Sequence, residues 1–136
     1  MTRSRIILGL VGGAMIIASA AAHSLLGWPQ LRAALVEGGV PAALIPGLTV
    51  GWHFGGAAML AFGIIVISLL VDRLRGRQVS LRPVLIIAVV YLLFGIGAIV
   101  YSRDAFFTIF VVPALLLLAA SWGQDAAAAR VGVRTT

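Results

Sequence analysis

The stretch GLTVGWHFGGAAMLAFGIIVISLLV, residues 47–71, decides the fold because its 25 residues include no Asp, Glu, Lys or Arg. At a rise of about 1.5 Å per residue, a helix of this length is about 38 Å long, enough to cross a hydrocarbon core of about 30 Å. Unpaired backbone groups inside a bilayer cost several kcal/mol each, and a helix pairs them all within one segment. The stretch therefore predicts a transmembrane helix.

Three further runs lack these charged residues: 6–26, 83–101 and 105–122. Each has a length close to that of one membrane crossing. Of the 136 residues, 62% are hydrophobic and 10% are charged, whereas soluble domains contain about half and a quarter of these classes. We therefore expect an all-α integral membrane protein. Its single domain, residues 1–136, should be a four-transmembrane-helix bundle with a flexible tail over residues 123–136.

The arginines predict the orientation of this bundle. The chain has ten arginines and no lysine, and its formal net charge is +6. Eight arginines lie before the first run, between the second and third runs, or in the tail: Arg3, Arg5, Arg73, Arg75, Arg77, Arg82, Arg130 and Arg134. Only Arg32 and Arg103 lie in the other two connections. Because arginine-rich connections stay in the cytoplasm, we expect both termini on the cytoplasmic side of the cell's inner (plasma) membrane.

The same arginines flank apolar runs and do not alternate with aromatic residues, so we expect no nucleic-acid partner. The first run also has a second interpretation. Arg3 and Arg5 precede it, and Ala18-Ser19-Ala20 resembles the cleavage site of a secretory signal peptide. The apolar run continues to Leu26, beyond that motif, which favours an uncleaved helix. Cleavage would leave three helices.

The outer connection, residues 27–46, predicts a short helix of its own. Pro29 can begin this helix and Gly38-Gly39 can end it. With Trp28 at the boundary of the first run, we expect the helix to lie in the membrane interface between the first two spans. It either covers the mouth of the bundle or is only a connector.

The connection Ser102-Arg103-Asp104 is so short that the last two helices should be antiparallel neighbours. The carboxylate of Asp104 is placed to cap the last helix.

Glycines at regular spacing predict where the helices pack. Gly47, Gly51 and Gly55 recur every four residues in the second run, as Gly9 and Gly13 do in the first. Small residues at this spacing let membrane helices approach closely. We therefore expect the second helix to pack through its three-glycine face.

Two histidines are the most informative polar residues of the runs, because ionisable groups at membrane depth are costly. His23 lies 17 residues after the start of the first run, and His53 lies 18 residues before the end of the second. Counting along the helices places both roughly 25–27 Å from the cytoplasmic ends, a level that Tyr101 also reaches. The candidate ligand-binding residues in and beside this layer are His23, His53, Tyr101, Thr49, Ser19, Trp52 and Arg103.

Three functions are compatible with these residues. In the first, His23 and His53 are the axial ligands of a b-type haem, or bind another metal together with Asp104, Glu37 or water. In the second, they line an outer-leaflet pocket for a lipid-like or quinone-like molecule, and a histidine donates a hydrogen bond or carries a proton. In the third, the histidines bond only to the protein, which is then an accessory or structural subunit. The sequence leaves open whether the chain acts alone, as a homo-oligomer or within a larger membrane complex.

Several other classes fit the sequence poorly. Small four-helix exporters driven by protons need a carboxylate inside the membrane, and no run has one. Cysteine is absent, which excludes thiolate metal sites and cysteine nucleophiles. We find no glycine-rich phosphate loop, nucleophile elbow or H-E-x-x-H motif, so the catalytic residues, if any, stay unknown. An enzyme that uses one of the histidines as general base is left open.

Overall fold

The computed structural model describes residues 1–122, which form helices joined by short connections. In chain order these are α1 (Arg3–Ala22), the π-helical turn η1 (His23–Gly27), α2 (Trp28–Glu37), the 3-10 turn η2 (Ala42–Leu44), α3 (Ile45–Leu74), α4 (Arg82–Ser102), the 3-10 turn η3 (Ala105–Phe107) and α5 (Thr108–Ser121). The described residues contain no strand, which confirms the all-α prediction. The predicted tail, residues 123–136, lies outside the described part of the chain.

Three helical segments are long and apolar enough to cross a membrane: Arg3–Glu37, Ala42–Leu74 and Arg82–Ser102. The fourth predicted run forms a shorter apolar helix, Ala105–Ser121. Some helices also include polar residues that flank the apolar runs, so these helices extend beyond their predicted limits. α3, for example, continues through Asp72 and Arg73 to Leu74, and Gly76, with a φ of 81°, turns the chain just after it.

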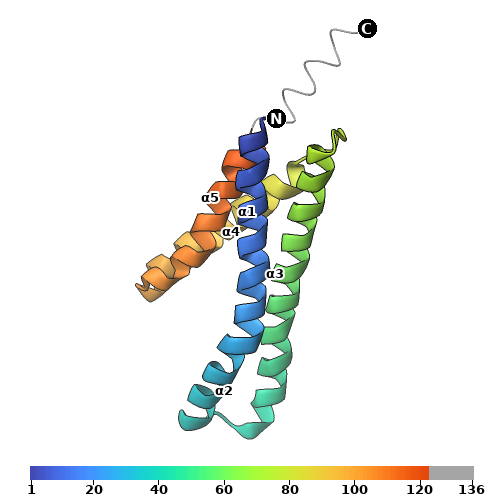
Figure 1. Ribbon diagram of the computed structural model, residues 1–136. Coiled ribbons are helices and arrows are strands. Elements are labelled where there is room, and N and C mark those ends of the chain that lie inside the picture. Colours follow the sequence, from blue (N-terminus) through green and yellow to red (C-terminus); the bar gives the residue numbers. More distant parts are fainter. Residues whose placement is uncertain (123–136) are drawn as a thin grey trace.

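α1, η1 and α2 form one continuous helical rod, which bends near η1 so that α2 is turned from the axis of α1 (Figure 1). Pro29 stands in the first turn of α2 and Gly38 ends it, as predicted. However, α2 continues onward from α1 beside the start of α3, and the expected break before a separate interfacial helix is not present. A proline removes one N–H donor and crowds the preceding turn. The wider π-helical turn just before Pro29 absorbs this disturbance, so the chain remains helical.

α1 and α3 lie side by side and run in opposite directions (Figure 1). A Cβ atom added to Gly63 would lie 3.2 Å from the carbonyl oxygen of Gly13 and 2.5 Å from Ile17 Cγ1. One added to Gly56 would overlap the hydroxyl of Ser24. These glycines therefore permit the close approach of the two helices.

The prediction that α3 packs through Gly47 and Gly51 was wrong, because a Cβ atom at either position would have no neighbour within 4 Å. The true contact face contains Gly56 and is offset by one residue from the predicted stripe, a rotation of about 100°. The α1 glycines were assigned correctly. A Cβ at Gly9 or Gly13 would come within 3 Å of the side chains of α3.

α4 and α5 form an antiparallel hairpin, as the short connection predicted. Arg103 turns the chain with a φ of 57°, and Asp104 Oδ1 accepts a hydrogen bond of 2.8 Å from the backbone N–H of Phe106. This bond confirms the predicted cap. Gly95 allows the two helices to meet, since its Cβ would lie 2.8 Å from Val111.

The α1–α3 pair and the α4–α5 hairpin pack tightly only at the end that carries the N-terminus. The largest fully buried aliphatic side chains are Ile16, Leu70, Leu81, Leu117, Val66 and Val84. Away from this end, the α4–α5 hairpin leans away from α1 and α3 (Figure 1). The bundle is therefore dense in one half and divided in the other.

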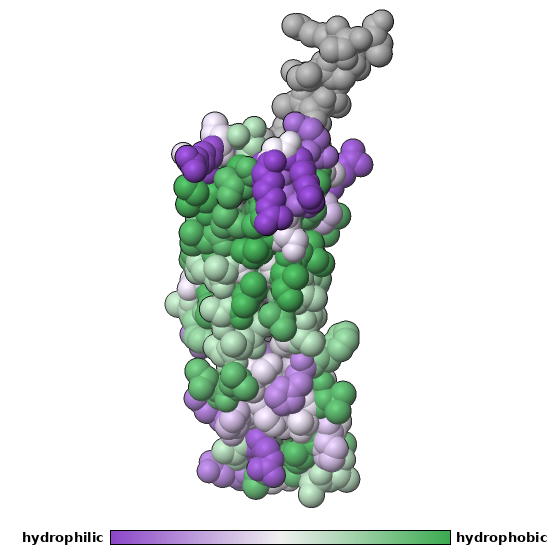
Figure 2. All heavy atoms as spheres, turned by 45° about the vertical axis from the view of Figure 1, so that its right-hand side comes forward, coloured by the Kyte–Doolittle hydropathy of each residue, from purple (hydrophilic) through white to green (hydrophobic). Residues whose placement is uncertain are grey.

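Charged side chains gather at the dense end. Figure 2 shows hydrophilic residues above a broad apolar band, with a sparser polar zone toward the opposite end. Arg5 donates a hydrogen bond of 3.4 Å to the carbonyl of Trp122, so the start of α1 and the end of α5 are neighbours. Arg77 pairs with Asp72 at 3.0 Å in the connection between α3 and α4.

Candidate ligand-binding site

His23 and Trp52 form a reciprocal pair at the junction of η1 with α3. Their rings stack with centroids 4.1 Å apart and an angle of 5° between the planes. The indole N–H of Trp52 donates to the carbonyl of His23 at 2.8 Å, and Nε2 of His23 lies 3.1 Å from the carbonyl oxygen of Trp52. Because a carbonyl oxygen only accepts, Nε2 is the donor of this hydrogen bond and carries a hydrogen.

Glycines on α3 leave room for this imidazole. A Cβ atom at Gly55 would lie 3.5 Å from Nε2 of His23, and one at Gly56 would lie 3.4 Å from Cδ2. The π-helical turn begins at His23 itself. Stacking, the hydrogen bond of Nε2 and the glycine surface hold the ring in one orientation, and the indole hydrogen bond fixes the backbone of His23 beside Trp52.

His53 points to a different neighbour. It is exposed, and its ring lies 5.9 Å from that of Trp28, at an angle of 58°. Trp28 also lies 6.3 Å from Trp52, so ring contacts connect the two histidines only through the tryptophans. The imidazoles share a layer, but do not face each other across an open space.

This geometry does not suit a haem or another metal. An axial pair needs two free imidazole nitrogens that face each other, whereas Nε2 of His23 is bonded to Trp52 and the ring of His53 lies against Trp28. Within residues 1–122, no three His, Asp or Glu side chains are grouped to hold a metal ion.

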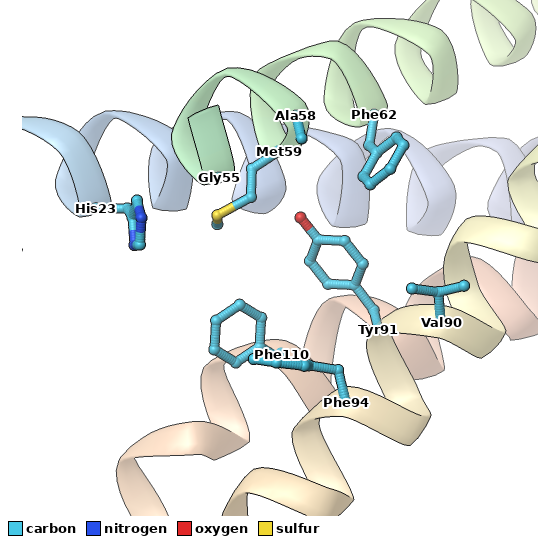
Figure 3. Close-up of a pocket in the computed structure, with 9 residues that line it drawn as sticks. All are labelled: His23, Gly55, Ala58, Met59, Phe62, Val90, Tyr91, Phe94 and Phe110. Carbon is cyan, nitrogen blue, oxygen red and sulfur yellow. The ribbon is translucent and has the colours of Figure 1, made fainter. Parts of the chain in front are cut away.

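A cavity of about 270 Å³ lies where the α4–α5 hairpin separates from the other helices. Its lining residues, drawn in Figure 3, are His23, Gly55, Ala58, Met59, Phe62, Val90, Tyr91, Phe94 and Phe110. The walls are almost entirely apolar. His23 is the one predicted site residue that reaches this cavity.

Tyr91 provides the hydroxyl group of the cavity. Its side chain is only 5% exposed, and its hydroxyl has no hydrogen-bond partner among the described residues. Figure 3 shows the hydroxyl pointing from α4 toward Ala58 and Met59 of α3. A buried hydroxyl without a partner is costly and uncommon in native structures. The sequence contained a signal for this residue, because Tyr91 lies in the middle of an apolar run and not at its boundary, where tyrosine is usual.

The remaining candidates lie outside the cavity. Trp52 holds His23, Ser19 is half-buried one turn before His23, and the hydroxyl of Thr49 donates to the carbonyl of Ile45 at 2.7 Å. Tyr101 is 93% exposed.

Arg103 lies at the tip of the α4–α5 hairpin. The structure does not bring this tip to the histidines, because the hairpin leans away from α1 and α3 (Figure 1). Equal depth along separate helices did not imply lateral contact.

A second hollow, of about 370 Å³, borders the first at His23 and Gly55. It is lined by His23, Leu31, Gly47, Leu48, Gly51, Trp52 and Gly55. The glycine stripe that the sequence assigned to helix packing thus lines an open groove.

Comparison of the chain with protein-family models, curated protein sequences and solved structures gave no match.

Proposed function

We propose that this protein crosses a membrane four times, with both termini in the cytoplasm, and binds an apolar small molecule in the cavity between Tyr91 and His23. The arginine-bearing ends of α1, α3 and α4 lie at one end of the molecule, which supports the orientation by the positive-inside rule. The segment Ala105–Ser121 returns beside α4, and its 17 residues are about 26 Å long, near the lower limit for one crossing.

The observation that carries the binding proposal is the Tyr91 hydroxyl, which is buried and unpartnered within the described residues at an apolar cavity. In a cavity used only for packing, a phenylalanine would avoid the cost of the unsatisfied oxygen. The oxygen itself is covered, and Met59 stands beside it (Figure 3), so a ligand with one hydrogen-bonding atom would satisfy the hydroxyl once Met59 moves aside.

The cavity has room for a small ligand or for part of a larger one. An apolar cavity of about 150 Å³ is sufficient for benzene, and this one measures about 270 Å³. A substituted ring, or a short length of hydrocarbon chain, therefore fits. The rest of a longer molecule would extend between the α1–α3 pair and the α4–α5 hairpin.

A route from the lipid phase is present at the margin of the cavity. Val90 and Phe94 line the cavity on α4, yet are about half exposed (51% and 57%) on the surface that we assign to lipid. A ligand already dissolved in the bilayer can therefore enter from the side. His23, fixed by Trp52, forms the wall at the opposite end.

The proposal can be tested by identifying what co-purifies with the protein in mild detergent. Organic extracts of the wild type should contain one apolar compound at near-stoichiometric amounts by mass spectrometry. Ala58→Leu, which fills the cavity, should remove most of it, whereas Ala57→Leu on the exposed side of α3 should not. If the extracts of both variants match the wild type, with only bulk lipid present, the protein is better described as an accessory or structural subunit.

A further inference from the structure

We infer that the cavity selects a neutral ring that carries a carbonyl oxygen, as in a quinone, over a simple acyl chain. This inference rests on the proposed function and specifies its ligand. Three features carry it: the depth of Tyr91, the aromatic walls around it and the single hydrogen bond that it can offer.

The depth of Tyr91 excludes a charged head group. Tyr91 lies nine residues after Arg82, about 14 Å along the inclined α4, so in the proposed orientation it lies within the hydrocarbon core, away from the arginine-bearing end. An ionised group is costly at this depth. The described residues that line the cavity include no Asp, Glu, Lys or Arg to compensate such a charge. The polar atom that meets Tyr91 should therefore belong to a neutral group.

The walls favour a flat ring over a flexible chain. The ring of Phe62 meets that of Tyr91 edge-on at 6.4 Å, and Phe110 lies 5.9 Å from Tyr91 on the other helix of the hairpin. Phe94 contacts Phe110 at 5.0 Å, also edge-on. Aromatic side chains give a bound ring edge-to-face and offset contacts that a saturated chain does not provide.

The hydrogen-bonding capacity of Tyr91 matches a ring carbonyl. The phenolic O–H can donate to a carbonyl oxygen, and no described residue competes for it. Met59 stands beside this hydroxyl in Figure 3, and its unbranched thioether side chain can rotate to admit the ligand. Quinones combine a neutral flat ring, ring carbonyls and an apolar tail that remains in the bilayer.

Calorimetric titration of the protein in detergent can test this selectivity with three probes. The first is a benzoquinone with a decyl tail, the second is decylbenzene and the third is 1-decanol. We expect the quinone to bind about tenfold more tightly than either of the others, which corresponds to one satisfied hydrogen bond in addition to the ring contacts. Tyr91→Phe should lower the affinity for the quinone to that for decylbenzene and leave decylbenzene unaffected. Tyr101→Phe, which changes the exposed tyrosine, should alter neither.

The outcomes separate the two proposals. Equal binding of all three probes, or an unchanged quinone affinity in Tyr91→Phe, would overturn the inference but leave a binding cavity in place. If no probe binds the wild type, the proposed function fails as well. Because Tyr91→Phe removes only one oxygen, retained thermal stability will show that the variant is folded.

Discussion

The two halves of the bundle differ in how completely side chains fill the space between helices. At the arginine-bearing end, Leu70, Leu81 and Leu117 are fully buried between the two helix pairs. In the other half the α4–α5 hairpin leans away, and the space holds the cavity of about 270 Å³. The same apolar composition thus produces a filled core in one half and an open cavity in the other. Hydropathy alone does not distinguish these uses.

The largest expected difference between the two ends is in their accessibility from outside the cell. The chain contains no cysteine, so each introduced cysteine is a unique label site. In intact bacterial cells that express the protein, a membrane-impermeant maleimide should label Ala42→Cys at the outer end. It should label Gln78→Cys, in the connection between α3 and α4, only after lysis. The opposite pattern would invert the proposed topology, and labelling of both in intact cells would exclude it.

The next largest effect concerns core filling in the dense half. Leu117 is 0% exposed and Leu115, on the same helix, is 52% exposed. Leu117→Ala should reduce the free energy of unfolding by about 2–5 kcal/mol through loss of contacts and creation of a void. Leu115 faces the surface, so Leu115→Ala should reduce the free energy of unfolding far less. Denaturation in mixed micelles can measure both, and equal effects would contradict the assignment of the core.

A smaller effect should distinguish the packed glycines from the open ones. Gly63→Leu should destabilise the protein by about 1–3 kcal/mol, because the new side chain meets the backbone of α1. Gly51→Leu should leave the melting temperature in detergent close to that of the wild type, since its Cβ has open space around it. A larger loss in Gly51→Leu would indicate that the groove on α3 is covered in the functional protein.

The positions of the apolar helices could be predicted from the sequence to within a few residues, because they depend on local runs of apolar residues and on local signals such as Pro29, Gly38 and Asp104. The rotation and inclination of helices could not. They depend on which side chains meet between helices, and a shift of one residue moved the contact face from Gly55 to Gly56.

The candidate site was predicted only in part for the same reason. His23 and Trp52 were among the predicted residues, but their stacking was not predicted. The sequence selected Tyr101 instead of Tyr91, because depth counting gave no information about the inclination of the α4–α5 hairpin.

The inclination of the α4–α5 hairpin has a consequence for the surrounding lipid. The apolar runs in α1 and α4, residues 6–26 and 83–101, are similar in length, about 32 Å and about 29 Å, but α4 is inclined relative to α1 (Figure 1). If the protein spans a bilayer as proposed, its hydrophobic surface is therefore lower beside the hairpin than beside α1, which is a hydrophobic mismatch within one molecule. Lipids adapt to a short surface by thinning locally. The membrane should therefore be thinnest beside the α4–α5 hairpin, where the cavity opens toward lipid.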